Sequence, residues 1–373
     1  MDIPFKFKII DQRSVKDFKD KTICEYLRKD VLSIFQKCLL VGKIEESCNW
    51  AMELLCCGHV DKVYDKLYTI IVKNININNK ELISIYVNRY LTYLRFKKVL
   101  NGDILRLRNF QNIRNHIAEL CTIVCLSTKT KAQTAVKITE DHFNMEFVKS
   151  KFKADRSNYI EPFSRFGDPE EVKIILNEFV YNLSKHNYDS SIYWIYWIME
   201  WEKINIKKRK EFKCGYRSIN NVEKKCLTNL VWIIWEILLN YNKNEYIEAL
   251  FSLYSHEFKL SQKSKKFPLI LFAIKIYTDS HKVISQNVYE KNMDTILQVC
   301  GNINKLFVEK KKREINNVKK QQEEIHETNY NKYNKIVSDE LKKKKNQNKE
   351  YEQSIKKMST LEELDSLFLS KST

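Results

Sequence analysis

Two groups of cysteine and histidine residues come nearest, by type and spacing, to a chemical site. Cys56, Cys57 and His59 lie close together, and Cys121 and Cys125 stand one helical turn apart. Thiolate and imidazole are common ligands of structural zinc, but such a site takes four of them. No second cluster supplies the complementary pair for either group, so we expect no metal site. Core packing of small apolar thiols explains both groups more simply.

The remaining candidate motifs are incomplete. Segments "HEFKL" at His256 and "HETNY" at His326 begin like a zinc-protease helix but lack the second histidine four residues on. The chain has only six scattered glycines, and no phosphate-binding loop of the G-x-x-x-x-G-K type occurs. We therefore predict a protein that is not an enzyme and that uses no cofactor and no metal ion.

The elements that would carry any site are predicted to be helices. The chain has 373 residues, of which 43% are apolar and 30% charged, but only six Gly and four Pro. Tight β-turns and hairpins depend on those two residue types. Apolar residues also recur at helical spacing, as at Ile44, Cys48, Ala51, Met52 and Leu55. The expected fold class is all-α, with two helical units and a charged C-terminal tail.

Shifts in composition indicate where these parts begin and end. A polar stretch that contains Pro162 and Pro169 marks the boundary between the two helical units. After it, tryptophan becomes frequent, and beyond Gly301 charged residues dominate. The predicted divisions are an N-terminal segment (1–21), a compact helical domain (22–133), a linker (134–169), a Trp-rich helical domain (170–301) and a charged helical or disordered tail (302–373).

The two helical units share a short pattern. A shift of 144 residues brings "IEESCNWAMELL" (Ile44 to Leu55) onto "YDSSIYWIYWIM" (Tyr188 to Met199). An internal duplication is one interpretation of this match. The interpretation that we favour is that any helix pair places an aromatic residue near its tightest packing point, because beyond Trp201 the two segments share nothing. The residues that coincide under the shift are Phe35, Leu39 and Trp50 with Phe179, Leu183 and Trp194.

The tryptophans of the second unit have two readings. Trp194, Trp197 and Trp201 cover two faces of one predicted helix, and Trp232 and Trp235 follow on another. We expect these five side chains to form a buried aromatic core. The alternative is a platform on which nucleobases stack.

The net charge points to an anionic partner. Sixty-five Lys and Arg against 47 Asp and Glu leave a formal charge of +18, which would attract nucleic acid, acidic proteins or anionic lipid. Nucleic acid is the partner we favour, although the same stretches would also serve as the wet faces of helices. Arginine offers planar donors suited to phosphate. The predicted contact residues are Arg106, Arg108, Lys207, Lys208, Arg209 and Lys210.

The tail carries 17 basic and 12 acidic residues over positions 302–373. Few apolar residues recur there, so we expect a solvated charged helix or disorder. A terminal motif, "STLEELDSLFL" (Ser359 to Leu369), breaks that pattern with an amphipathic helical spacing. It is expected either to dock into a groove of a partner or to fold back on its own chain.

Cysteine usage and hydropathy indicate the compartment. The N-terminus, "MDIPFKFKIID", has no apolar signal region, and no apolar run is long enough for a membrane span. Ten cysteines scattered through apolar helical patterns favour a reducing compartment over a disulfide framework. We expect a cytoplasmic or nuclear protein without a membrane partner, or one of the viral factory or virion if the chain is viral.

One segment resembles a known family. "NWAMELLCCGHVDKVYDKLYTIIVKNININN" (Asn49 to Asn79) resembles the helix pair of the C-terminal oligomerisation domain, or clamp-loader collar, in the RarA/MgsA branch of AAA+ proteins, which includes the Werner-helicase-interacting protein. The family's Tyr-Trp falls on Asn49 and Trp50, its glycine turn on Gly58, and its Asp-Ile-Gly-Leu-Ala-Asp segment on residues 74–79.

A later stretch extends the resemblance. "HIAELCTIVCLSTKTKAQ" (His116 to Gln133) is similar to a helix end of the same family, with Lys129 on the family's lysine. Departures from the pattern include Val72-Lys73 for Ser-Glu, Asn76 for Gly and Thr128 for Pro. The similarity covers residues 32–133 approximately, and the family's ATPase module has no counterpart upstream, so a collar without a motor is expected.

The resemblance implies an assembling role beside DNA. We expect a non-enzymatic accessory or scaffold protein of DNA replication or repair that forms homo-oligomers or joins AAA+ clamp-loader-like subunits. The alternative is a structural, genome-associated protein packaged in a large DNA virus particle. The expected core and oligomerisation residues are Trp50, Leu54, Leu67, Ile75 and Ile77.

Overall fold

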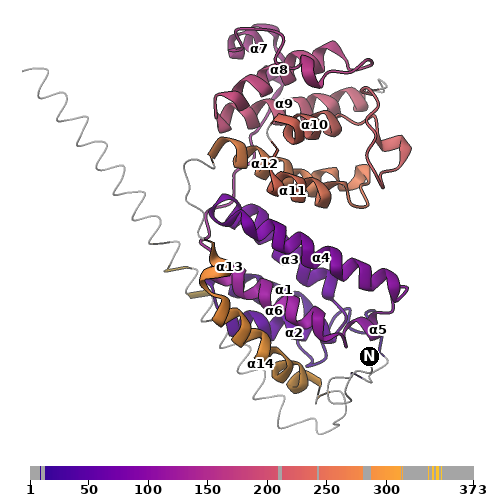
Figure 1. The fold of residues 1–373 in the computed structure, drawn as a ribbon, viewed down its shortest axis with the longest axis vertical. Helices are drawn as coiled ribbons and strands as arrows, with labels where there is room; N and C mark the ends of the chain where they lie inside the picture. The colour runs from indigo at the N-terminus through magenta and orange to yellow at the C-terminus, as the bar shows by residue number, and fades with distance from the viewer. Residues whose placement is uncertain are drawn as a thin grey trace, which may run out of the picture. The chain divides into compact units, whose positions relative to one another are not determined.

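The computed structural model describes residue 9, residues 13–208, 212–241, 243–279 and 287–311, residue 313, and six isolated positions between 335 and 346. Over this part of the chain the fold is all-α, as predicted, and it contains no β-strand (Figure 1). The first half contains α1 (Arg28–Val41), α2 (Ile44–Cys56), α3 (Val60–Ile70), α4 (Glu81–Val99), α5 (Ile104–Leu107), α6 (Gln111–Leu126) and α7 (Met145–Lys151). The second contains α8 (Glu170–Ser184), α9 (Tyr188–Lys207), α10 (Val231–Tyr241), α11 (Glu245–Ser255), α12 (Lys263–Asp279), α13 (Val288–Lys291) and α14 (Met293–Lys311).

The helices form two compact units that each combine distant parts of the chain. Unit 1 consists of residues 1–63, 102–125 and 297–373, and unit 2 of residues 64–101 and 126–296. These boundaries do not follow the predicted domains. Residues 64–101, placed by sequence in the first domain, belong to unit 2, where α4 packs on α11.

Unit 1 is built on the antiparallel pair of α1 and α2, with α6 and α14 packed against it (Figure 1). Alpha-helix α2 is buried along most of its length. The predicted tail boundary at residue 301 falls inside α14, whose Ile303 and Phe307 side chains are buried. Arg114 of α6 lies 4.2 Å from the centre of the Phe307 ring and donates to Asn304. Residues 302–311 are therefore part of a packed core helix.

Unit 2 is built on a second pair, α8 and α9, onto which α12 packs (Figure 1). Alpha-helix α11 bridges α12 and α4. The aromatic core predicted for this region lies here: Trp194, Trp232 and Trp235 are buried, as is Trp197, while Trp201 is half-buried. Trp232 meets Tyr254 and Phe258 edge to face.

The two helix pairs are related by the shift of 144 residues that the sequence suggested. α2 begins at Ile44 and α9 at Tyr188, which are 144 positions apart. In both pairs the chain turns through a left-handed residue at equivalent places, Gly42 with φ 89° and His186 with φ 53°. The residue after each donates its N–H back to the first helix, in the same register. These bonds are Lys43 N to Cys38 O and Asn187 N to Asn182 O, both 3.0 Å.

A serine in the next helical turn repeats as well. The Ser47 hydroxyl donates to the Lys43 carbonyl at 2.6 Å, and the Ser191 hydroxyl donates to the Asn187 carbonyl at 2.7 Å. The turn geometry, the serine hydrogen bond and the buried Trp50 and Trp194 therefore coincide over both helix pairs, although only the second pair has a side-chain N-cap, from Asn187. This agreement supports the duplication over the alternative of two unrelated pairs that share an aromatic residue.

Candidate nucleic-acid interface

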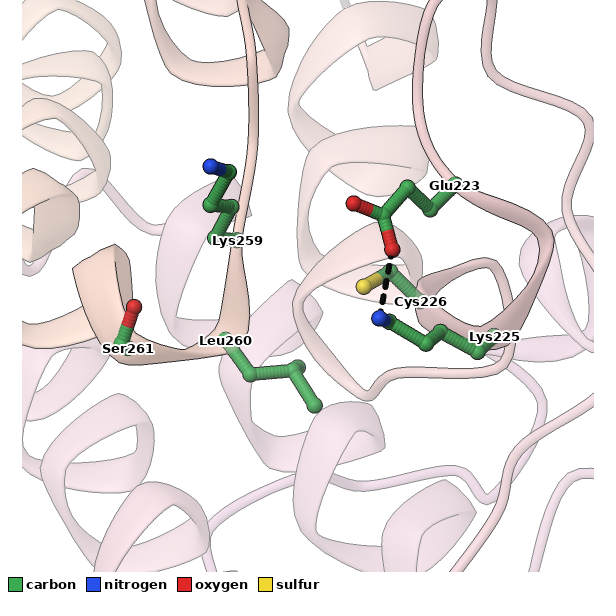
Figure 2. Close-up of a pocket in the computed structure, with 6 residues that line it drawn as sticks. All are labelled: Glu223, Lys225, Cys226, Lys259, Leu260 and Ser261. Atoms are coloured by element: carbon green, nitrogen blue, oxygen red, sulfur yellow. Dashed lines mark ion pairs between the residues drawn. The ribbon is translucent and has the colours of Figure 1, made fainter.

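A pocket of about 420 Å³ opens on the surface of unit 2. Figure 2 shows Lys259, Leu260 and Ser261 on one side of it and Glu223, Lys225 and Cys226 on the other. The first group leads into the short helical turn η7 (Leu260–Gln262), and the second into the turn η6 (Lys224–Cys226). The ammonium groups of Lys225 and Lys259 and the Ser261 hydroxyl are groups that bind anions, and the Glu223 carboxylate beside them pairs with Lys225.

Aromatic packing beneath the pocket fixes its two sides. Cys226 is buried, and its carbonyl accepts the indole N–H of Trp232 at 2.7 Å. The Trp232 ring also meets the ring of Phe258, with centroids 4.8 Å apart. Phe258 directly precedes Lys259, so one tryptophan positions both walls.

The pocket lies within a wider group of lysines. The neighbouring segments are held together by three contacts: Cys214 N donates to Thr228 O at 2.9 Å, Asn229 donates to Glu202, and Lys263 pairs with Glu202. Among the described residues of these segments, seven lysines are exposed, against three exposed or half-exposed glutamates, Glu200, Glu223 and Glu257. We call them the lysine cluster: Lys203, Lys207, Lys208, Lys213, Lys224, Lys225 and Lys259.

Part of this charge is neutralised locally. Lys225 lies 2.6 Å from Glu223, and Lys203 lies 2.6 Å from Glu200. Three of the four side chains are more than half exposed and Glu200 is 36% exposed, so each pair is weak and can open when an anion approaches. The Lys225 ammonium beside Glu223 holds the pKa of that carboxyl below its usual value.

A buried ion pair connects the segments that carry the lysine cluster. Glu202 of α9 and Lys263 at the start of α12 are both largely buried and pair with each other. Burial lowers the pKa of Lys263, and the Glu202 carboxylate opposes that shift. The second Glu202 oxygen accepts from Asn229 at 3.2 Å. The ion pair therefore connects three segments of unit 2 and has a structural role.

A second buried network holds the adjoining loops. Arg217 is buried and donates all five of its N–H groups. Two go to the Asp168 carboxylate at 2.8 Å each, and one goes to Glu236 at 2.6 Å. Burial works against the charged guanidinium, but Asp168 and Glu236 outweigh it and raise the pKa of Arg217. With no donor left for a ligand, Arg217 has a structural role.

The basic residues predicted from sequence are distributed unevenly. Lys207 and Lys208, at the end of α9, are exposed and belong to the lysine cluster, whereas Arg209 and Lys210 lie outside the described residues. Arg106 is exposed but belongs to unit 1.

The prediction for Arg108 is wrong. Its side chain is buried, and one guanidinium N–H donates to the carbonyl of Cys56 at 2.9 Å. It therefore ties α5 to the end of α2 and does not reach a ligand on the surface. Arg106, two positions earlier, remains exposed because residues that far apart on a helix point in nearly opposite directions.

The residues assigned to the core and to oligomerisation are all buried: Trp50, Leu54, Leu67, Ile75 and Ile77. Ile75 ends a π-helical turn, η2 (Ile71–Ile75), and Ile77 lies in the 3₁₀ turn η3 (Asn76–Asn79) that follows. Asn76 between them has φ 36°. Asn74 O accepts Thr130 N at 2.6 Å. The segment that resembles the collar motif is therefore hydrogen-bonded to the chain that follows α6.

Neither cysteine group forms a ligand set. Within the described ranges, no three His, Cys, Asp or Glu side chains are arranged to hold a metal ion. All ten cysteines fall within those ranges, and no disulfide joins them. Burial raises the pKa values of the Cys56 and Cys57 thiols, which keeps both as packing groups.

Sequence reasoning missed Lys225 and Lys259, which line the pocket, and Lys224, which directly precedes Lys225 in the chain. The dipeptide Lys224-Lys225 and the single Lys259 resemble any other lysines in a Lys-rich chain. Only the contact of Trp232 with both loops brings them together. A buried tryptophan linked to two lysine-bearing loops is not a sequence motif.

No family model, curated protein or solved structure matches the chain. Its class is thus given by the fold and the site: an all-α protein with an internally repeated helix pair and a lysine-rich surface on unit 2. None of the described helices is long and apolar enough to cross a bilayer.

Proposed function

We propose that the protein is a non-enzymatic, all-α scaffold that binds nucleic acid through the lysine cluster of unit 2. The observation that carries this proposal is a pocket lined by two exposed lysines, Lys225 and Lys259, with five more exposed lysines on the adjoining segments, which buried ion pairs hold in place. Lysines on a rigid base attract a phosphate backbone without ordering a flexible surface first. Such contacts position a nucleic acid and carry no sequence preference.

The resemblance of residues 49–79 to a clamp-loader collar supports a place in DNA replication or repair. On this proposal the chain assembles with itself or with AAA+ clamp-loader-like subunits and brings nucleic acid to the assembly. Light scattering at micromolar concentration should then report a mass above the 44.7 kDa of one chain. A mass equal to one chain would remove self-assembly from the proposal.

The ten cysteines, nine of them buried and none in a disulfide, support a reducing compartment. We place the protein in the cytoplasm or nucleus on that basis.

The direct test is the affinity for fluorescently labelled DNA, measured by anisotropy for the full chain and two variants. Lys224/Lys225/Lys259→Ala removes three charges at the pocket. Lys16/Lys19/Lys29→Ala removes three exposed charges from unit 1 and serves as the matched control. We expect the pocket variant to weaken binding roughly tenfold or more and the control to change it less than twofold. Equal effects of the two variants would mean that binding follows net charge, and the proposed site would be wrong.

A further inference from the structure

Two exposed aromatic rings stand beside the lysine cluster. Phe166 has a relative exposure of 104%, and Tyr216 one of 55%. Phe166 is thus as accessible as in an unfolded chain, although phenylalanine is normally among the most buried residue types. The exposure of two such rings on neighbouring loops is not explained by packing within unit 2.

The loops that carry these rings touch through their backbones. A Cβ placed on Gly215 would lie 2.7 Å from the carbonyl oxygen of Phe166. Gly167 adopts φ 89°, and a Cβ there would come within 3.5 Å of the Gly215 Cα. Gly215 requires glycine because the Phe166 carbonyl approaches too closely for a side chain, and Gly167 favours glycine because its φ is left-handed. We call the two loops, residues 165–168 and 214–217, the aromatic tip.

The aromatic tip is held rigidly from inside. Asp168 accepts the backbone N–H groups of Arg165 and Gly215, each at 2.8 Å, and also two N–H groups of Arg217. Arg165 in turn donates to Tyr216 O at 3.2 Å. A buried, fully satisfied network is a stiff support, so the exposure of the two rings is a built feature and not the result of a loose loop.

The same segments continue into the lysine cluster. Lys213 precedes Cys214, whose N–H bonds to Thr228 O, and Arg217 N bonds to Leu227 O at 3.1 Å. The partner segment begins with the pocket residues Lys225 and Cys226. Tyr216 and exposed ammonium groups therefore share one pair of adjoining segments in unit 2, and the loop that carries Phe166 contacts that pair at Gly215.

We propose that the aromatic tip is a base-stacking platform that makes unit 2 select single-stranded over duplex nucleic acid. Bases of a duplex are stacked on one another and have no face to offer, whereas a single strand presents its bases to aromatic rings and its phosphates to lysines. The inference rests on the proposed nucleic-acid binding and adds which form is bound. The core tryptophans cannot take this part, because Trp194, Trp232 and Trp235 are buried.

The test compares a labelled 20-nucleotide single strand with its duplex, each titrated with the full chain. Phe166→Ala/Tyr216→Ala should weaken single-strand binding roughly 5- to 100-fold and leave duplex binding within twofold. Phe166→Tyr, which keeps an aromatic face, should retain most of the affinity. The matched control is Ile174→Ala, which removes a similarly exposed apolar side chain from α8.

Photocrosslinking gives a second readout. An oligonucleotide with 5-iodouracil should form adducts on Phe166 or Tyr216, detected by mass spectrometry of the digested protein. Unchanged single-strand affinity in the double alanine variant, with adducts elsewhere, would overturn the inference and leave the tip as a surface for a protein partner. That result would leave the proposed function standing, because the proposed function is tested separately by the two lysine variants.

Discussion

Lys310 Nζ lies 3.3 Å from Oε2 of Glu53, and both side chains are buried in unit 1. Glu53 lies in the last turn of α2, and its other carboxylate oxygen accepts Cys24 N at 2.9 Å. Lys310 comes from the end of α14 and also lies 5.8 Å from the centre of the Trp50 ring. The pair therefore fastens the last described helix to the first helix pair.

Removing one partner should cost more than removing both. Lys310→Met leaves an uncompensated carboxylate in the core and should lower the free energy of unfolding by about 3–5 kcal/mol. Glu53→Gln/Lys310→Met should recover part of that loss. Lys305→Met, an exposed position on the same helix, is the control and should change stability by less than about 0.5 kcal/mol. Urea unfolding measures all three, and a Lys310→Met value equal to the control would show that the pair is not formed.

The same pair predicts how stability depends on pH. Burial would raise the pKa of Glu53, but Lys310 and the bonds from Cys24 hold it below its usual 4.5. Its contribution is therefore present above pH 4.5 and is lost as the pH falls. Burial opposes the charge on Lys310 too, but Glu53 raises its pKa above 10.5, so its contribution is lost as the pH rises through that raised value. Stability should decline at both ends, and Glu53→Gln should flatten the acid limb; an unchanged acid limb would contradict this.

Trp50 fills the core of the first helix pair. Its ring is 2% exposed and meets the ring of Tyr26 edge to face, with centroids 5.5 Å apart. Trp50→Ala would leave a cavity and should lower the free energy of unfolding by about 3–5 kcal/mol, seen as a large fall in melting temperature. Trp50→Phe keeps most of the volume and should lose less. A melting temperature within a degree or two of the wild type would show that the side chain does not pack as described.

Gly215 tests the support of the aromatic tip. Gly215→Ala would place a Cβ 2.7 Å from the Phe166 carbonyl, so the two loops must move apart and the Arg217 network must distort. We expect a loss of about 1–3 kcal/mol, and single-strand affinity should fall with it. Gly301→Ala in α14, where a Cβ meets nothing within 4 Å, is the control and should be neutral or slightly stabilising. Thermal melting of both variants decides the point: equal stability would rule out the close approach.

Much of the fold could be predicted because helical spacing is local. Apolar residues at helical intervals and the scarcity of Gly and Pro led to the correct class. The matched tryptophans pointed to the pairs α1–α2 and α8–α9, but from sequence alone they did not favour a duplication. The unit boundaries could not be predicted in this way. Residues 64–101 join unit 2 through the packing of α4 on α11, which are far apart in sequence.

The candidate site was only partly accessible to sequence reasoning. Arg106 and Arg108 look alike in the sequence, but one is exposed and the other is buried against Cys56 O. In the sequence, Phe166 is an ordinary apolar residue in a polar stretch. The position of its loop depends on the close approach of the Gly215 backbone, which the sequence does not indicate. The exposed fraction of a single side chain depends on its contacts with segments that are distant in the sequence. The spacing of apolar residues along the chain does not indicate those contacts.

The measurement that tests the central claim most directly is the salt dependence of DNA binding. The account predicts that the logarithm of the affinity falls linearly with the logarithm of salt concentration, by roughly 0.7 for each phosphate contacted on a single strand. Loss of three contacts in Lys224/Lys225/Lys259→Ala should reduce the slope by about 2, and Lys16/Lys19/Lys29→Ala should leave it unchanged. A slope that is the same for the wild type and both variants would contradict the assignment of nucleic-acid binding to the lysine cluster.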